Sequence, residues 1–560
     1  MMRALLALSF GIAACGDSYV VVTVNAQPGI DGATQLAVVA SNAGAMQQQT
    51  FELGTHQFPV TFSIATSGRS GELELALSAF GSDGTLLGVG SGEASVGSDL
   101  AVTLDPADFV VNTDFTTDQF LTDDYETGGF QVAATNGGPW TVSFRNTCTD
   151  DCQIFARMFD PSGEPLKTEV ASSTNAFTLT TNATTDQTFP AVAAANASTL
   201  AVWDSTSDAG SNGIACRGID ASGALTTQNQ VTLSPDLADT VTIAPLSTGD
   251  FAVAWQITTP TIAIRTIIAQ ADCTALGSAA TASTTVGTMD GPHRASVASN
   301  GSSVLYTWIT DGAVHARAAT PTGGFNGAEF TLFAAPAGYT IEQARVASLG
   351  TGFGVAVRSI TADGTTGGMI QLIATNAAGQ PLPGMPVTIS DQTGADFSVG
   401  AQGFSIATRG DGATLITWQQ CNDGSPGPCL GDMDVFGALV RATGALVGAP
   451  FEIATTTAGD QTSPAAAALA NAFAVAWNDS SKTAPDTTSL AVRARVIYPP
   501  FDQSTRVSGA ACRSSADCNA GLACAMHSDG AARCSATCSA RCERGGVCRT
   551  ALDGGTACAF

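Results

Sequence analysis

The stretch Thr188–Leu225, TFPAVAAANASTLAVWDSTSDAGSNGIACRGIDASGAL, recurs in degraded form about seven times between residues 115 and 500. Each copy holds a short apolar run, a turn rich in Gly, Asn or Ser, and a second apolar run that usually ends in Trp. A polar loop, a third run and a turn of the form Asp-x-x-Gly follow. A sequence period of this length is typical of repeat architectures, and it has to be interpreted before any single motif.

The residue that ends the second run marks the period. Successive copies of it lie 49 to 61 residues apart, and five of the six tryptophans occupy it. Large aromatic side chains fill the flat space between packed sheets, so we expect these residues to pack between repeats. The alternative is an exposed platform for a ligand. The seven residues are Phe144, Trp203, Trp255, Trp308, Val357, Trp418 and Trp477.

Four short strands in each unit of 50–60 residues predict the blade of a β-propeller. Helical periodicity is absent, and a parallel β-helix would need a period about half as long. We therefore predict an all-β protein in which residues 111–505 form a propeller of about seven blades, with six or eight as alternatives. Asp160–Gly163 and Asp220–Gly223 are expected to turn the third strand into the outer fourth one.

A propeller ring closes when one blade takes strands from both ends of the chain. Phe109–Asp114 and Gln119–Thr122 are the two segments that can supply the missing strand, and the sequence does not choose between them.

Residues 15–110 predict a separate domain of six or seven short strands. Its apolar runs alternate or are rich in β-branched residues, which favours an immunoglobulin-like or transthyretin-like β-sandwich acting as a spacer. Gly88–Gly92 (GVGSG) is expected to be a hairpin turn, because neither a helix pattern nor a lysine follows it as a phosphate loop would require. The five clearest runs are residues 19–24, 35–40, 60–64, 72–79 and 99–104.

Residues 506–560 hold eight cysteines, and the spacing of the first four is approximately repeated in the last four. This pattern predicts a small disulfide-rich module. Zinc is disfavoured because the module contains no Cys-x-x-Cys pair. The eight are Cys512, Cys518, Cys524, Cys534, Cys538, Cys542, Cys548 and Cys558. Elsewhere Cys148 and Cys152 are close in sequence, as are Cys421 and Cys429. Cys216 and Cys273 then remain as a candidate pair between neighbouring repeats.

Residues 1–14 predict a signal peptide, because Arg3 precedes an apolar stretch too short to span a bilayer. Ile12–Cys15 (IAAC) resembles the lipobox of bacterial lipoproteins. That resemblance implies cleavage before Cys15 and a lipid (palmitate) anchor on its thiol, and therefore a place in the cell envelope, at the outer membrane or cell surface. An ordinary secretory signal with an incidental cysteine is the alternative.

The order of lipobox, small β domain, repeat array and terminal cysteine-rich module resembles large surface lipoproteins of myxobacterial type. The resemblance implies location more than activity.

Charged residues make up only 12% of the chain, and 22 basic against 48 acidic side chains give a net charge of −26. This balance disfavours nucleic-acid binding and attachment to anionic lipid through a basic patch. The apolar stretch of the signal peptide is too short for a membrane helix, and no other apolar run is long enough either. We expect contact with the membrane only through the lipid anchor, and the oligomeric state stays open.

No sequence motif of a known catalytic class is present, and the histidines at 56, 293, 315 and 527 are scattered, so no catalytic or metal residue is predicted. We expect no cofactor. Loops after the Trp strand at Asp204–Asp208, Asp479 and Asp486 allow Ca²⁺ as a weaker alternative to solvated turns. Arg409-Gly410-Asp411 is expected to be an ordinary hairpin turn of the sixth blade, with an adhesion motif as the alternative.

These features favour a binding or adhesion scaffold for a glycan or a protein partner, with the ligand at the central opening or on one loop face. The alternatives are an extracellular, glycosidase-like hydrolase and a purely structural spacer. Three convergent carboxylates or an arginine trio at the axis would favour the hydrolase. The loops that differ most between copies are residues 145–153, 204–213, 419–434 and 478–489.

Overall fold

The computed structural model describes residues 7–9, 19–30, 32–43, 45–54, 56–112, 118–121, 131–135, 137–146, 152–166, 176–181, 186–206, 213–236, 238–258, 261–284, 293–362, 367–393, 403–421, 432–442, 444–487, 490–499 and four strands beyond residue 500. The chain divides into two compact units, Met1–Ile497 and Tyr498–Phe560. All regular structure in the described ranges is β, and they contain no helix long and apolar enough to cross a membrane.

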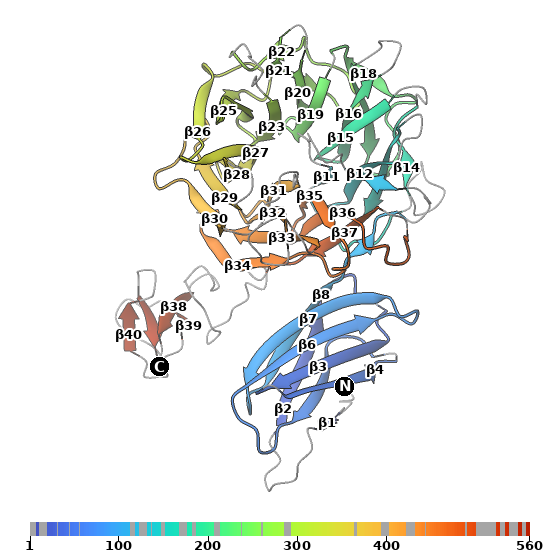
Figure 1. Cartoon of the computed structure of the whole chain (residues 1–560), viewed down its shortest axis with the longest axis vertical. Helices are drawn as coiled ribbons and strands as arrows, with labels where there is room; N and C mark the ends of the chain where they lie inside the picture. Colours follow the sequence, from blue (N-terminus) through green and yellow to red (C-terminus); the bar gives the residue numbers. More distant parts are fainter. Residues whose placement is uncertain are drawn as a thin grey trace. The chain divides into compact units, whose positions relative to one another are not determined.

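Seven sheets stand around a common centre and form a seven-bladed propeller (Figure 1), which confirms the all-β repeat architecture. The innermost strands are β11 (Val132–Ala134), β15 (Asp186–Ala195), β19 (Ala238–Pro245), β23 (His293–Ser299), β27 (Tyr339–Leu349), β31 (Phe404–Thr408) and β35 (Gln461–Ala468). Each pairs antiparallel with the second strand of its blade. The second strands are β12 (Trp140–Asn146), β16 (Ser198–Thr206), β20 (Phe251–Ile257), β24 (Val304–Thr310), β28 (Gly352–Thr361), β32 (Thr414–Cys421) and β36 (Phe473–Asp479).

The outer half of each blade continues the same antiparallel ladder. The third strands are β13 (Ile154–Phe159), β17 (Gly213–Asp220), β21 (Ala263–Ala269), β25 (Ala313–Ala319), β29 (Gly367–Thr375), β33 (Met433–Val440) and β37 (Ala491–Ile497). The fourth strands of blades one to six are β14 (Phe177–Thr178), β18 (Val231–Ser234), β22 (Ala280–Thr281), β26 (Phe330–Ala334), β30 (Val387–Thr393) and β34 (Leu446–Glu452).

The seventh blade takes its fourth strand from the beginning of the propeller sequence, because β9 (Phe109–Val110) pairs antiparallel with β37. The second candidate segment has a different place: β10 (Gln119–Phe120) pairs with β12 of the first blade. The seventh blade therefore includes the chain from Phe109. Both segments lie at the junction of the first and last blades.

The residue that ends each second run is fully buried in all seven blades. Five of them share a core cluster with the preceding blade: Trp203 shares one with Met158, for example, and Trp308 shares one with Ile264. These residues fill the wedges between blades, as expected from their repetition around the ring.

Residues before the propeller form one eight-stranded curled sheet, in the order β1-β5-β2-β8-β7-β6-β3-β4. Its strands are β1 (Ala7–Ser9), β2 (Tyr19–Ala26), β3 (Gln35–Asn42), β4 (Ala45–Glu52), β5 (Val60–Ala65), β6 (Glu72–Phe80), β7 (Leu86–Ser95) and β8 (Leu100–Pro106). The expected two-sheet sandwich is replaced by this single sheet because β8 pairs with β2 along its first part and with β7 along its last two residues.

The expected hairpin turn at Gly88–Gly92 is wrong, because these residues lie inside β7. The glycines are needed where the sheet curls tightly. A Cβ at Gly88 would lie 2.7 Å from Ile30 Cδ1, and one at Gly90 would lie 2.8 Å from the Thr103 carbonyl oxygen. Glycine here serves close packing within a strand rather than a turn.

The second unit contains two described hairpins, formed by β38 (Leu522–Met526) with β39 (Ala532–Ala536) and β40 (Val547–Thr550) with β41 (Thr556–Ala559). Their registers place Cys524 opposite Cys534 and Cys548 opposite Cys558. The doubled cysteine spacing therefore corresponds to two similar hairpins.

Candidate functional site

The seven inner strands enclose a cavity of about 240 Å³ on the propeller axis. Each blade contributes three consecutive residues, so 21 residues line it. The first of each three is Val132, Val192, Ile243, Val297, Val346, Ile406 or Ala466.

The middle residue is alanine in every blade. Seven strand edges converge here, and the small alanine side chains leave room for the cavity between them. In the sequence these residues look only like weak strand formers. They are Ala133, Ala193, Ala244, Ala298, Ala347, Ala407 and Ala467.

The third residue divides the cavity wall into two arcs. Blades four to six carry Ser299, Ser348 and Thr408, whereas the other four blades carry Ala134, Ala194, Pro245 and Ala468. We call these sets the hydroxyl arc and the apolar arc. Ser299 Oγ accepts a hydrogen bond from Gly301 N at 3.2 Å, and Thr408 Oγ1 lies 3.0 Å from Thr414 Oγ1. Because each hydroxyl has one donor and two acceptor positions, both retain capacity for a further partner.

The arcs adjoin the hairpins that join first and second strands. Two of these hairpins are tied to the next blade: Ser247 Oγ donates to the Gly301 carbonyl at 2.7 Å, and Asn300 Nδ2 donates to the Thr351 carbonyl at 2.8 Å. These bonds join the rims of blades three to five.

The Arg409–Asp411 tripeptide lies in the corresponding hairpin of the sixth blade, between β31 and β32. The Arg409 side chain is buried, and its Nη2 is 2.9 Å from Asp411 Oδ2. Its guanidinium also lies over the Phe473 ring. An arginine committed to these contacts is a turn residue, so the geometry disfavours the adhesion motif.

The opposite end of the second strands carries a polar position that the sequence analysis missed. The residue directly after the Trp position is polar in six blades, and Ile309 is the exception. The six are Arg145, Asp204, Gln256, Arg358, Gln419 and Asn478. The same period that revealed the tryptophans contains this signal one residue later. Four of the six begin the long variable loops, whose residues 147–151, 207–212, 422–431 and 488–489 lie outside the described ranges.

At this end two buried arginines of blade five, Arg345 and Arg358, lie near the half-buried Arg294 of blade four. Arg358 Nη1 lies 3.1 Å from Glu342 Oε2, and Arg294 donates to the Glu342 backbone carbonyl. Burial and the charge of Arg294 lower the pKa of Arg345 to about 9, and burial also lowers the pKa of Arg358. None of these arginines lines the axial cavity, so the trio is not the axial one that would have indicated a hydrolase.

The expectation that the loop aspartates are solvated is wrong for three of them, because Asp204, Asp479 and Asp486 are buried. Asp479 Oδ2 accepts from Arg493 Nε at 2.8 Å, and Asp486 Oδ2 accepts from Gln119 Nε2 at 3.0 Å. Both carboxylates thus have protein partners at the junction of the first and last blades. Among the described residues, no group of three or more His, Cys, Asp or Glu side chains is placed to hold a metal ion.

The histidines do not come together. His56 is exposed on the curled sheet, and His293 lies at the start of β23. His315 Nδ1 lies 2.8 Å from Glu329 Oε1, and its ring stacks on Trp308. His527 is outside the described ranges.

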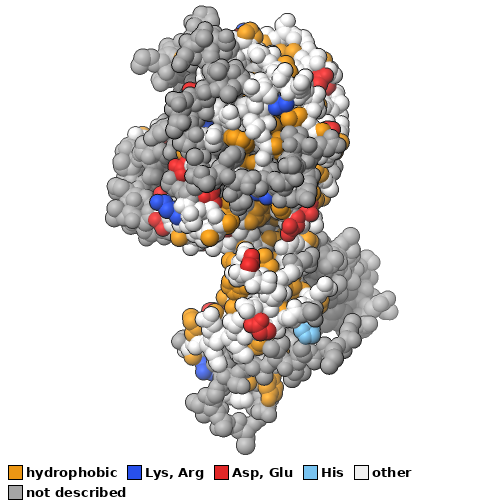
Figure 2. Space-filling view, turned by 90° about the vertical axis from the view of Figure 1, so that its right-hand side faces the viewer, with side chains coloured by type: hydrophobic (Ala, Val, Ile, Leu, Met, Phe, Trp, Pro, Cys, Tyr) orange, Lys and Arg blue, Asp and Glu red, His pale blue; other side chains and the backbone are white. Residues whose placement is uncertain are grey.

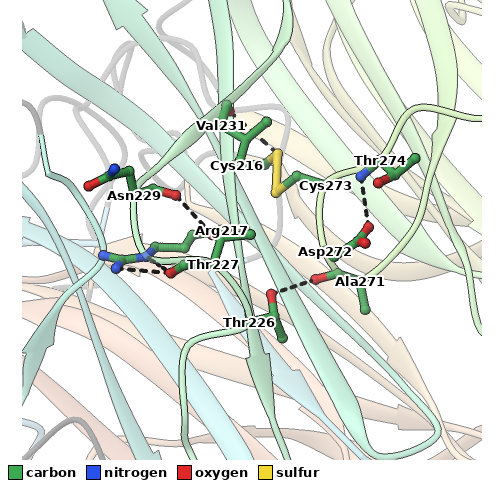
Figure 3. Close-up of a disulfide and its surroundings, with 10 residues drawn as sticks. All are labelled: Cys216, Arg217, Thr226, Thr227, Asn229, Val231, Ala271, Asp272, Cys273 and Thr274. Atoms are coloured by element: carbon green, nitrogen blue, oxygen red, sulfur yellow. Dashed lines mark hydrogen bonds between the residues drawn. A yellow bond between two sulfur atoms is a disulfide. The ribbon is translucent and has the colours of Figure 1, made fainter.

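Cys216 of blade two and Cys273 of blade three form a disulfide, with their Cα atoms 6.1 Å apart (Figure 3). Cys152 is also disulfide-bonded, and so is Cys421, each in a separate bond. The remaining cysteine candidates lie outside the described ranges: Cys15, Cys148, Cys429, Cys512, Cys518, Cys538 and Cys542. On the surface, charged side chains are scattered among uncharged ones (Figure 2), which agrees with the composition.

No protein-family model matches this sequence, and no curated protein matches it. Among solved structures, the chain is similar to the BP39L lectin from Burkholderia pseudomallei, with 15% identity over 66% of this chain and 96% of the lectin and a TM-score of 0.44. It is also similar to a protein of unknown function from Dyadobacter fermentans, with 10% identity over 70% of this chain and 98% of that one and a TM-score of 0.42.

An ulvan lyase of polysaccharide lyase family PL25 shows 10% identity over 69% of this chain and 95% of the lyase, with a TM-score of 0.42. At these identities the resemblances concern the fold and carry no information about the ligand. The arrangement of its own sheets shows that the chain is a seven-bladed β-propeller protein.

Proposed function

We propose that this protein is a lipid-anchored, glycan-binding protein of the cell envelope. The observation that carries the binding function is the axial cavity. It is built by all seven blades from main-chain edges, small apolar groups and three hydroxyls, and none of its 21 lining residues has an ionisable side chain. Polar groups of this kind can orient a sugar through hydrogen bonds.

Binding is favoured over hydrolysis because glycoside cleavage commonly uses a pair of carboxylates that exchange protons with the substrate. The cavity wall offers hydroxyl groups and no carboxylate, so it lacks the general acid and base that this chemistry uses. The buried arginines of blade five do not supply a general acid or base either, because a guanidinium stays protonated.

The envelope location rests on Cys15. It stands four residues before β2, the first strand of the curled sheet after the expected cleavage point, which begins at Tyr19. A lipid on its thiol would therefore hold that strand within about 14 Å of the membrane surface. The disulfide-bonded cysteines of the propeller support export, because disulfides persist in oxidising compartments.

The binding function is tested with the mature chain carrying Cys15→Ala, presented to a glycan array and to immobilised envelope extract. We expect one or more glycans to be retained and released unchanged. Turnover of a bound glycan would instead identify a hydrolase or lyase, and capture of a protein alone would make the partner a protein.

The anchor is tested by labelling with radioactive palmitate in an expressing bacterium. We expect label in the wild-type chain and none in Cys15→Ala. Equal labelling of the two would refute the anchor.

A further inference from the structure

The axial cavity has the dimensions of a small ligand. Its volume of about 240 Å³ lies below the roughly 300–1,000 Å³ of pockets that hold drug-sized molecules. A cavity of this size accepts one sugar ring rather than several consecutive ones.

The two arcs match the two chemical faces of a sugar. A pyranose presents C–H groups on its ring face and hydroxyls along its edge. In the cavity, Ala134, Ala194, Pro245 and Ala468 form one continuous arc because blades seven, one, two and three are neighbours in the ring. Ser299, Ser348 and Thr408 follow one another on blades four, five and six. A ring placed between the arcs can meet apolar contacts on one side and hydrogen-bonding groups on the other.

Ser348 lies at the centre of the hydroxyl arc. Within the described part of the chain its hydroxyl makes no hydrogen bond, whereas Ser299 and Thr408 each make one. A hydroxyl without a protein partner beside a cavity is available to a ligand or to water. Ser348 is therefore the residue at which a ligand contact can be tested with the least effect on folding.

The cavity also selects by charge. No lining residue can neutralise an ionised group, and an unpaired charge placed among alanine and valine side chains loses its hydration without compensation. A carboxylate or sulfate on the bound ring is thus excluded by the wall itself.

We propose that the axial cavity binds a single uncharged sugar residue at the end of a glycan chain, with its hydroxyl edge toward Ser299, Ser348 and Thr408. This inference rests on the proposed glycan-binding function. It adds the place of the site, the size of the unit that is recognised and the exclusion of acidic sugars.

The test compares two glycans that differ only at C6 of the terminal ring, a hexose and the corresponding uronic acid, by calorimetry on the mature Cys15→Ala chain. We expect the hexose to bind at least tenfold more tightly. Ser348→Ala should weaken hexose binding by about two- to tenfold, because one hydrogen bond is lost. Ser348→Met should abolish binding by filling the cavity.

The matched control is Ser278→Ala, at an exposed serine of blade three that does not line the cavity. It should bind like the unsubstituted chain. Melting temperatures identify any variant that has failed to fold, and Ser348→Ala keeps the test valid if Ser348→Met does not fold.

The outcomes separate the two proposals. Glycan binding that is unchanged in both Ser348 variants, or equal binding of the uronic acid, would overturn the axial site while leaving glycan binding itself in place. Absence of binding to any glycan by the unsubstituted chain would overturn the proposed function and this inference together.

Discussion

Trp255 illustrates how a single side chain holds two blades together. It is completely buried, and it shares one core cluster with Leu200 and Val202 of the preceding blade. Its indole Nε1 donates to Asp236 Oδ2 at 3.2 Å, which satisfies the one polar atom of the ring system. Tryptophan is large and apolar and has one hydrogen-bond donor, so it can fill the space between two blades while its N–H reaches a polar loop at the edge of that space.

Trp255→Ala is expected to lower the free energy of unfolding by about 3–5 kcal/mol, because it removes buried area and leaves a cavity between blades two and three. Denaturant titration followed by the remaining tryptophan fluorescence measures the change. An unchanged denaturation midpoint would contradict packing of Trp255 between blades. It would instead favour the alternative interpretation, in which the tryptophans form an exposed platform for a ligand.

Asp105 is a residue whose ionisation opposes folding. Burial raises its pKa to about 6 from an ordinary value of 3.8, and the nearby charge of Arg495 offsets only part of this effect. Since the pKa in the folded state lies above the unfolded value, protonation favours the fold. The stabilising contribution is complete below about pH 4 and is lost as the pH rises through about 6.

The side chain of Asp105→Asn cannot ionise. At pH 7.5 this variant should therefore have a free energy of unfolding roughly 1 kcal/mol larger than wild type, after allowance for partial exposure, and should melt at a higher temperature. The difference should disappear as the pH falls below 4. Calorimetric melting of both proteins from pH 3.5 to 8 tests this, and a difference that does not vary with pH would rule out Asp105 as the source.

At the scale of elements, the turn between third and fourth strands has a role beyond reversing the chain. In blade one, Asp160 Oδ1 accepts from Ser162 N at 2.8 Å, and Gly163 has a positive φ of 100°. A Cβ on Gly163 would lie 3.1 Å from Phe109 of blade seven, and one on Gly323 would lie 3.1 Å from Ile268 of blade three. These two turns therefore rest on the preceding blade, and glycine is needed there for the backbone as well as for the contact.

Blade three departs from this pattern in an informative way. Cys273 occupies the glycine position with a φ of 69°, in the left-handed region that costs an L-residue about 1–2 kcal/mol. It forms the disulfide with Cys216 of blade two. A covalent bond thus replaces the packing contact made by the turns of blades one and four.

Cys216→Ala should lower the free energy of unfolding by about 2–4 kcal/mol under oxidising conditions. Adding Cys273→Gly to this variant should recover about 1 kcal/mol, because glycine adopts the positive φ freely. Denaturant midpoints of the single and double variants measure both effects. A double variant less stable than the single one would show that Cys273 contributes packing that outweighs the backbone.

At the scale of the whole molecule, the ring depends on a closure that joins residues nearly 400 positions apart. Arg493 of β37 lies between two buried carboxylates, with Nη1 2.9 Å from Asp108 Oδ1 and Nε 2.8 Å from Asp479 Oδ2. Asp108 also accepts hydrogen bonds from the amides of Thr455 and Thr456. This buried network fastens β9 to the last blade.

Arg493→Met should cost about 3–5 kcal/mol, because it leaves two buried carboxylates without their cation. The matched control is Arg265→Met, since Arg265 lies 3.8 Å from Asp236 in a more exposed pair that should contribute less than about 1 kcal/mol. Chemical denaturation of the two variants compares them. Equal loss in both would show that the closure network adds nothing beyond an ordinary surface pair.

The strands were predictable where their sequence alternates or is rich in β-branched residues. The runs at 35–40 and 72–79 correspond closely to β3 and β6, whereas the run at 99–104 is displaced, with β8 at Leu100–Pro106. The polar edge strand β4 and the glycine-rich β7 were missed, because an edge strand has little apolar surface to bury and glycines carry no hydrophobic pattern.

The sequence by itself determined the repeat, its four strands per unit and a number of blades near seven, because each blade encodes its own strand pattern within about 60 neighbouring residues. The structure fixed the number at seven and showed that the tryptophans are buried. Tertiary structure alone decided which segment closes the ring, which blade each turn rests on and what lines the axis. The cavity wall consists of seven three-residue segments from residue 132 to 468. Their side chains form a common surface only after the ring has closed, so no local sequence pattern predicts the cavity wall.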